Sequence, residues 1–457
     1  MSSKKDTKIQ ENKMGVMPVN KLLLNMSLPM MVSMLVQALY NIVDSIFVAK
    51  LSENALTAVS LAFPIQTLLI ALGTGTGVGV NSLLSKQLGE GDLKQVSKTA
   101  MNGIFLAVMN FIVFVMVGIV GVRPFYASQL KDADPEILSY GIQYLTIVCV
   151  CSFGIYAQLI FEKLLQSTGK TLYSMITQAV GAVINIILDP ILIFGLLGMP
   201  KLGVAGAAIA TVIGQIVGGT LGFWFNIRKN KEITLSIKGF RPDGATIANI
   251  YKVGVPAIIM QAIGSVMTYG MNTFSSTATA VFGVYFKLQS FFFMPVFGLN
   301  NGLIPIVAYN YGAGKRSRLV KAVKCSLVYA FALLFVGFIV FQTVPAALLG
   351  MFEASDEMLA IGVPALHIIG IHFLAAWFCI IAGSVFQALG NGVYSLVVSV
   401  ARQLVVLLPV AYILAQLGGL NAVWWSFPIA EMMSLCVSAL FMIRIHKKVI
   451  SKVPDNQ

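Results

Sequence analysis

Apolar stretches long enough to cross a lipid bilayer recur along the whole sequence. A transmembrane helix needs about 20 apolar residues to cross a hydrocarbon core of about 30 Å. The chain has 457 residues, of which 57% are hydrophobic and 11% are charged, too little charge to cover a soluble protein of this length. The apolar runs are continuous rather than alternating, which argues against a membrane β-barrel. The sequence therefore predicts an all-α, multi-pass membrane protein.

The hydropathy pattern predicts about twelve transmembrane helices. Their expected ranges are 22–49, 55–83, 98–121, 136–161, 172–196, 203–226, 253–275, 279–309, 325–350, 361–387, 395–415 and 421–443. The first 21 residues are polar and lysine-rich, and the apolar run after them is too long for a cleavable signal. The five cysteines are scattered and lie mostly inside apolar segments, which predicts neither a disulfide framework nor a metal site.

The net charge of +13 is distributed unevenly among the loops. Lysine and arginine cluster before the first span, after the second, fourth, sixth and eighth spans, and after the last one. The alternate loops hold only Lys50, Arg123, Lys131 and Lys201. By the positive-inside rule, we expect both termini in the cytoplasm and the spans in the cell membrane. The basic residues therefore indicate membrane topology, and we expect no nucleic-acid partner.

Four motifs of the first half recur in the second half in the same order. "SLPMM" matches "GVPAI", "QLGEGD" matches "NYGAGK", "LLQSTGKTLYSM" matches "VFQALGNGVYSL", and "AAIAT" matches "FPIAE". Since each half has six spans, we expect two homologous lobes related by a pseudo-two-fold axis along the membrane normal. The expected parts are a cytoplasmic tail (1–21), an N-lobe (22–227), a cytoplasmic linker (228–252), a C-lobe (253–443) and a second cytoplasmic tail (444–457).

Two acidic residues lie deep inside spans of the first half, at Asp44 and Asp189. An ionisable group at the bilayer centre costs roughly 2.5–3.5 kcal/mol on insertion scales, so each is a candidate functional residue. Asn185 lies one turn before Asp189 on the same helix face, and Thr211 is expected at a similar depth. Two close carboxylates in a low dielectric cannot both stay ionised, so the group would bind H⁺ or Na⁺. The alternative is that both acids only form hydrogen bonds between helices.

Two further charges lie deep in the second half. Lys287 is in the eighth span, and Glu431 is in the twelfth, at the repeat position of Thr211. We expect these two side chains to face each other as an ion pair or a second proton site. Arg402 lies two turns from the cytoplasmic end of the eleventh span, and we expect its side chain to extend toward the membrane surface.

The remaining motifs point to transport without a cofactor. "GTGTGVGVNS" (73–82) lacks the Lys-Ser/Thr pair of a phosphate loop, and its glycines suit close helix packing instead. The sequence has neither a metal-ligand cluster nor a nucleophile motif, so an enzyme is not expected. Phe291 and Met294 are candidates for an adaptable apolar substrate pocket.

The motifs taken together resemble a known transporter family. "SLPMMVSMLVQALYNIVDSIFVAKL", "QLGEGD", "LLQSTGKTLYSM" and "NIILDPILIFG" are similar to segments of the multidrug and toxin extrusion (MATE) transporters, in their bacterial multidrug branch. The resemblance covers about residues 20–445, and the "NxxxDP" element with the span-one aspartate is its most specific part. It implies two lobes around a V-shaped cavity that opens alternately to each side. It also implies an antiporter that exports cationic amphiphilic drugs, including antibiotics, in exchange for H⁺ or Na⁺.

The resemblance also implies roles for individual residues. The cation site of the family's N-lobe matches Asp44, Asn185, Asp189 and Thr211. Positions that line its N-lobe drug pocket match Gln37 and Tyr40, and we add the adjacent Asn41. The C-lobe acids of another branch are absent from spans seven and ten, which argues against a C-lobe Na⁺ site. We expect a monomer in the bilayer.

Other classes of membrane protein are also compatible with the two-lobed pattern. A flippase for lipid-linked precursors would be favoured by a cavity rich in arginine and lysine, whereas the deep residues here are mainly acidic or neutral. A receptor would normally carry a soluble signalling region, and both tails are short. The sequence leaves the choice between H⁺ and Na⁺ open.

Overall fold

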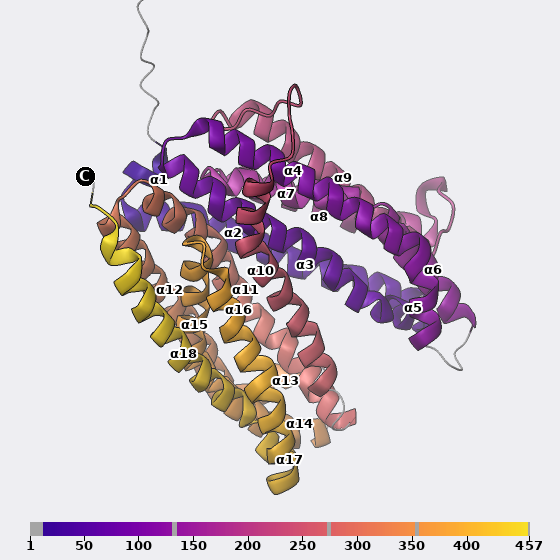
Figure 1. Ribbon diagram of the computed structural model, residues 1–457. Helices are drawn as coiled ribbons and strands as arrows, with labels where there is room; N and C mark the ends of the chain where they lie inside the picture. Colours follow the sequence, from indigo (N-terminus) through magenta and orange to yellow (C-terminus); the bar gives the residue numbers. More distant parts are fainter. Residues whose placement is uncertain (1–11, 130–134, 272–275, 352–355, 456–457) are drawn as a thin grey trace, which may run out of the picture.

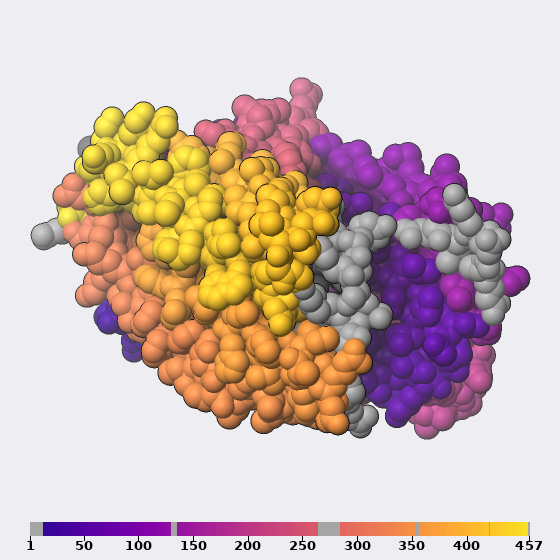
Figure 2. Space-filling model, turned by 90° about the horizontal axis from the view of Figure 1, so that it is seen from below, coloured from indigo at the N-terminus to yellow at the C-terminus, as the bar shows by residue number. Residues whose placement is uncertain are grey.

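The computed structural model describes residues 12–129, 135–271, 276–351 and 356–455. Three predicted segments fall partly outside these ranges: residues 1–11 of the amino-terminal tail, residues 272–275 at the end of the seventh span, and residues 456–457 of the carboxy-terminal tail. The described chain folds into two helical lobes that meet at one end and diverge toward the other (Figure 1). Seen from the diverging end, the lobes lie side by side (Figure 2).

The helices follow one another in the order that the repeats predict. The N-lobe contains α2 (Val19–Leu51), α3 (Glu53–Gly89), α4 (Leu93–Met116), η1 (Val117–Gly121), α5 (Val122–Gln129), α6 (Pro135–Val150), α7 (Phe153–Ser167), α8 (Thr171–Phe194), η2 (Leu196–Gly198) and α9 (Val204–Lys229). The C-lobe contains α10 (Gly244–Met271), α11 (Ser276–Gly312), α12 (Arg316–Thr343), α13 (Pro345–Gly350), α14 (Asp356–Gly370), α15 (Phe373–Ala388), α16 (Gly392–Val400), η3 (Ala401–Leu407), α17 (Leu408–Val423) and α18 (Ser426–Lys448). The short α1 (Lys13–Val16) precedes both lobes, and η4 (Ile450–Lys452) follows them.

Ten helices of the described chain are long and apolar enough to cross a membrane, and two bent pairs raise the number to twelve. The fourth and tenth predicted spans correspond to these bent pairs. The helices α6 and α7 meet at 45°, and α14 and α15 meet at 50°. At each break the backbone forms a tighter i→i−3 hydrogen bond, from Ser152 to Cys149 and from His372 to Ile369. The bends occupy equivalent positions in the two repeats.

Backbone geometry at the matched motifs supports the two-fold relation of the lobes. Pro29 lies inside α2, and its counterpart Pro256 lies inside α10. Gly91 and Gly314 end matched helices with φ of 79° and 65°, in the left-handed region that favours glycine. The prediction of an all-α membrane protein with two repeated lobes is therefore confirmed.

One close contact between the two lobes lies where α3 and α11 end. A Cβ atom on Gly89 would overlap the carbonyl oxygen of Tyr309, and one on Gly312 would overlap that of Lys86. Because Gly89 and Gly312 are equivalent in the repeats, this contact lies on the pseudo-two-fold axis. We call this contact the glycine seam. Any side chain at either glycine would push the two backbones apart.

Polar contacts between the lobes accompany the glycine seam. The Ser82 hydroxyl donates a hydrogen bond to the carbonyl of Gln387 at 2.8 Å. The buried Lys163 ammonium donates to the side-chain oxygen of Asn301 at 3.1 Å. The Ser27 hydroxyl also donates to the carbonyl of Leu299 at 3.4 Å, so hydrogen bonds and helix packing together hold the lobes at this end.

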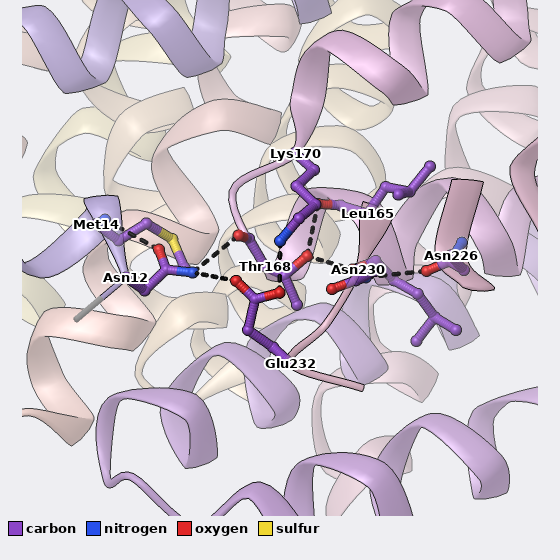
Figure 3. A network of polar contacts seen from close by, with 9 residues as sticks. Asn12, Met14, Leu165, Thr168, Lys170, Asn226, Asn230 and Glu232 are labelled. Atoms are coloured by element: carbon purple, nitrogen blue, oxygen red, sulfur yellow. Dashed lines mark hydrogen bonds and ion pairs between the residues drawn. The ribbon is translucent and has the colours of Figure 1, made fainter. Parts of the chain in front are cut away.

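The short helix α1 bridges the lobes at the same end of the molecule. On the N-lobe side, the Asn12 amide donates to the carbonyl of Thr168 and to Glu232, both at 3.1 Å (Figure 3). On the C-lobe side, the carbonyl of the fully buried Met14 accepts hydrogen bonds from Asn310 at 3.2 Å and Arg318 at 3.1 Å. The amino-terminal segment is thus a strap across the joint, and not merely a polar tail.

The loop that enters α10 is shorter than predicted. The helix begins at Gly244, inside the stretch expected to be linker, because Asp243 accepts hydrogen bonds from the hydroxyl and the backbone N–H of Thr246. These hydrogen bonds, together with Lys98, lower the pKa of Asp243 to about 2. The capped helix end fixes where α10 starts.

Docking of α1 is expected to tighten when the charge of Lys13 is removed. Burial, and then repulsion by Lys170, lower the pKa of Lys13 from 10.5 to about 8. The docked lysine therefore binds a proton less tightly than a released one. The free-energy cost of docking α1 with a charged Lys13 is full below pH 8 and fades as the pH rises to 10.5. Lys13→Met should slow hydrogen exchange of the α1 amides at pH 7 by roughly tenfold, since one pKa unit is a tenfold change and partial exposure reduces the shift.

The control for this prediction is Lys21→Met, which removes an exposed lysine from α2 and should leave the exchange of α1 unchanged. Lys13 also donates a 2.6 Å hydrogen bond to Asn25. Faster exchange in the Lys13→Met protein would mean that this bond outweighs the cost of burying the charge, contrary to our expectation.

Candidate functional site

The N-lobe brings its two deep acids together. Asp44 on α2 is half-buried, and Asp189 on α8 has no exposed surface. Their carboxyl groups lie within hydrogen-bonding range of each other. Such a contact requires a shared proton or a bound cation, because two bare carboxylates repel each other strongly in a low dielectric. The expected convergence of the first and fifth spans is therefore present.

The amide of Asn185 links this carboxyl pair to the sixth span. Its nitrogen lies 3.1 Å from the Thr211 hydroxyl on α9 and 3.4 Å from Asp189. Three buried oxygens of the group have no hydrogen-bond partner among the described residues, namely Asp44 Oδ1, Asn185 Oδ1 and Asp189 Oδ2. Buried acceptor oxygens that lack a donor fit a proton or a small hard cation such as Na⁺. No cluster of three or more His, Cys, Asp or Glu side chains suited to a metal occurs in the described part of the chain.

Close helix packing positions these side chains. A Cβ atom on Gly214 of α9 would lie 2.6 Å from the carbonyl oxygen of Gly181 on α8, so glycine is needed for this approach. The same approach carries Thr211, one turn earlier on α9, to Asn185. The α2 side is held by Gln178 of α8, whose amide donates to Gln37 at 3.2 Å and whose oxygen accepts from Ser33.

Two tyrosines complete the surroundings of the carboxyl pair. Tyr40 of α2 and Tyr144 of α6 interact electrostatically with both acids. The Tyr144 hydroxyl is held by the amide of Gln66 at 2.9 Å. Tyr40 was predicted as a substrate residue, whereas Tyr144 and Gln66 were missed. The signal for both was present in the sequence, since each is a polar side chain inside an apolar span.

The remaining substrate candidates lie on α2, beside this cluster, and on α11 of the other lobe. Asn41 is exposed on α2, and the side-chain oxygen of Gln37 accepts a hydrogen bond from Gln178. On α11 of the other lobe, Phe291 is 66% exposed and Met294 is half-buried. The site residues of the N-lobe therefore form one group, and the two C-lobe candidates do not belong to it.

The C-lobe charges pair differently from the prediction. The carboxylate of Glu431 lies 3.0 Å from the guanidinium of Arg402, and the structure shows no such contact between Glu431 and Lys287 among the described residues. Arg402 thus turns into the lobe instead of extending to the membrane surface. The physical reason is the π-helix η3, which contains Arg402 and changes the angular register that the 3.6-residue period predicts.

The chain is similar to multidrug exporters over most of its length. It is 28% identical over 418 residues, covering 90% of each chain, to the multidrug export protein MepA of Staphylococcus haemolyticus. It is 29% identical to MepA of Staphylococcus saprophyticus, covering 93% of each chain. Among solved structures, a multidrug resistance MATE family transporter in an outward-facing conformation shares the fold with a TM-score of 0.89 at 24% identity, covering 97% of this chain and 99% of that one. A MOP superfamily transporter from Pyrococcus furiosus reaches 0.88 at the same identity and coverage.

A helical membrane protein made of two repeats, with a polar site buried inside one repeat, has the construction of a membrane transporter. The MatE family profile matches residues 29–191 and 254–413. The chain belongs to the MatE family, which confirms the resemblance seen in its motifs. It is therefore a transporter and not an enzyme.

Proposed function

We propose that the chain exports cationic amphiphilic drugs in exchange for H⁺ or Na⁺ by alternating access. The observation that carries this proposal is the contact of Asp44 with Asp189, in which one oxygen of each carboxyl group and the neighbouring Asn185 oxygen lack a donor. The relatives named multidrug export proteins support the direction and the class of cargo. The same carboxyl pair would attract a cationic drug or a coupling cation, but not both at once.

The orientation in the membrane follows from the basic loops. Lysine and arginine cluster at the end that holds both termini and the linker, so we infer that this end faces the cytoplasm. The glycine seam and the α1 strap then close the cytoplasmic side, and the diverging ends face outward (Figure 1). On this basis, we also propose residues 22–227 and 253–443 as the lobes, joined by 228–252 and flanked by cytoplasmic tails.

Coupling requires only that ion and drug compete for one site. When H⁺ or Na⁺ enters from outside, the carboxyl pair of α2 and α8 loses its negative charge. A cationic drug held near Tyr40, Asn41 or Gln37 then loses its electrostatic partner and is released outward. Each ligand binds one conformation better than the other, and this difference drives the alternation. We propose Phe291 and Met294 as the adaptable apolar wall contributed by the C-lobe.

Ethidium transport in vesicles tests this function and identifies the ion. Purified protein in proteoliposomes should move ethidium against its gradient when a pH gradient is imposed, or when a Na⁺ gradient is imposed at equal pH. Reversing the effective gradient should reverse the direction of transport. Protein-free liposomes give the background. Ethidium movement that stays at background under both gradients would refute ion-coupled export.

A further inference from the structure

A second polar pocket lies inside the C-lobe, far along the sequence from the N-lobe acids. It is a cavity of about 80 Å³ between α11, α15, η3 and α18. Its walls combine the aromatic rings of Phe286 and Phe427 with the charged pair Arg402–Glu431. The arginine side chain is 34% exposed and the glutamate 3%, so the pocket opens on the arginine side and ends at the carboxylate.

Hydrogen-bond acceptors in this pocket exceed the donors available to them. Glu431 binds Arg402 through Oε2; the thiol of Cys379, a weak donor, lies beside the carboxylate, and Oε1 has no hydrogen bond of normal geometry among the described residues. The Oε1 atom of Gln403 is also buried without a donor, and both side chains are less than 9% exposed. Burying an acceptor without a donor is costly, so both oxygens are suited to a ligand that supplies N–H groups.

A histidine at the bend of the tenth span adds a further acceptor. The Nδ1 atom of His372 lies 2.6 Å from the carbonyl oxygen of Ile369, which can only accept, so Nδ1 carries the proton. In the neutral ring, Nε2 is then an acceptor, and its nearest donor is the Gln289 amide at 3.5 Å. The aromatic rings around the pocket would stabilise a cation further through their π faces.

The backbone forms a π-helix in the wall of this pocket. Arg402, Gln403 and Leu407 all line the pocket, and all three belong to the seven-residue π-helix η3. The wider turn brings the consecutive residues Arg402 and Gln403 onto one cavity. Such π-helical segments are rare and occur frequently at functional sites.

We propose that this C-lobe pocket is a second ligand site, which takes the guanidinium, amidinium or primary ammonium group of a cation. Glu431 and Gln403 accept its N–H groups, and Phe286 and Phe427 flank its apolar body. The guanidinium of Arg402 already occupies one oxygen of Glu431, which shows that the carboxylate accepts this kind of group. Arg402 is therefore a tethered competitor that an incoming cation displaces. The site does not depend on the N-lobe carboxyl pair.

Calorimetric titration of the full chain with benzamidine, an aromatic amidinium, tests the proposal. The titration is done in the Asp44→Asn/Asp189→Asn background, so that binding in the N-lobe does not contribute. Arg402→Gln removes the competitor and should tighten benzamidine binding roughly tenfold, and Arg402→Gln/Glu431→Gln should weaken it below the starting protein by roughly the same factor. Lys86→Gln/Glu90→Gln, which neutralises a half-exposed ion pair elsewhere, should change nothing.

A milder variant keeps the test decisive if removal of Arg402 unfolds the protein. Gln403→Met keeps the length of the side chain but deletes the acceptor, and it should weaken benzamidine binding roughly threefold to tenfold. Tetraphenylphosphonium, a cation without N–H groups, should bind this variant as it binds the starting protein. Benzamidine binding that is unchanged by Gln403→Met, or weakened by Arg402→Gln alone, would overturn the proposal. If the C-lobe variants change benzamidine binding as expected but the protein transports no ethidium, only the function proposed above is refuted.

Discussion

Asparagine in place of Asp189 is expected to abolish drug export while leaving the protein folded. The substitution keeps the size of a side chain that has no exposed surface, and it supplies an N–H group to the partner carboxyl of Asp44. A purely structural hydrogen bond between α2 and α8 would therefore survive. Only the ability to take up and release H⁺ or Na⁺ is lost, so export should fall to the background measured without protein. Ethidium efflux in vesicles checks the loss of export, and the thermal stability of the purified protein checks that it remains folded.

The matched control is Asp92→Asn. Asp92 caps α4 by accepting a hydrogen bond from the backbone N–H of Gln95, and asparagine caps a helix almost equally well. This variant should export ethidium like the parent. If the Asp189→Asn protein also exports at the parental rate, the carboxyl pair has only the structural role and the proposed mechanism is wrong.

A single methyl group at Gly89 is expected to damage both stability and transport. The Cβ atom of alanine would overlap the backbone of Tyr309 and Ala313, which cannot move aside as a flexible side chain could. Forcing an extra carbon into such a contact typically costs about 1–3 kcal/mol. Because the seam closes one side of the transporter, we expect a lower melting temperature and a loss of ethidium efflux of roughly tenfold or more, the factor that about 1.4 kcal/mol represents.

Gly244→Ala is the control for the seam. A Cβ atom at Gly244 would meet no other atom within 4 Å, and alanine favours the helix that begins there. This variant should therefore match or exceed the parent in stability. A Gly89→Ala protein with parental melting temperature and efflux would show that the backbones at the seam can separate freely.

Several features could be predicted because they leave a strong local signal in the sequence. Asp44 and Asp189 stand out as charges inside apolar runs, and the depth along each span was sufficient to place them on one level. The repeated motifs aligned Gly91 with Gly314, and the structure shows both in the left-handed region. Their neighbours Gly89 and Gly312 were aligned with each other by the same repeat, although nothing local indicated that the two would touch.

Other features depend on tertiary contacts that no local pattern records. The bend at Ser152 has no proline or glycine pair to mark it, so nothing in the local sequence indicated it. The α1 strap rests on backbone carbonyls such as that of Met14, which look the same at every residue. The pairing of Glu431 with Arg402 and not Lys287 depends on rotation around a helix, and a π-helical segment alters that rotation without a sequence signature.

The position of the glycine seam gives the transporter considerable leverage. The helices α3 and α11 are each 37 residues long, or about 55 Å at 1.5 Å per residue, and they meet at their last turns. If the seam were the pivot, a rotation of about 10° would sweep their far ends through roughly 10 Å. A small readjustment at one pair of glycines would then become a displacement on the scale of a bound molecule at the opposite face of the membrane.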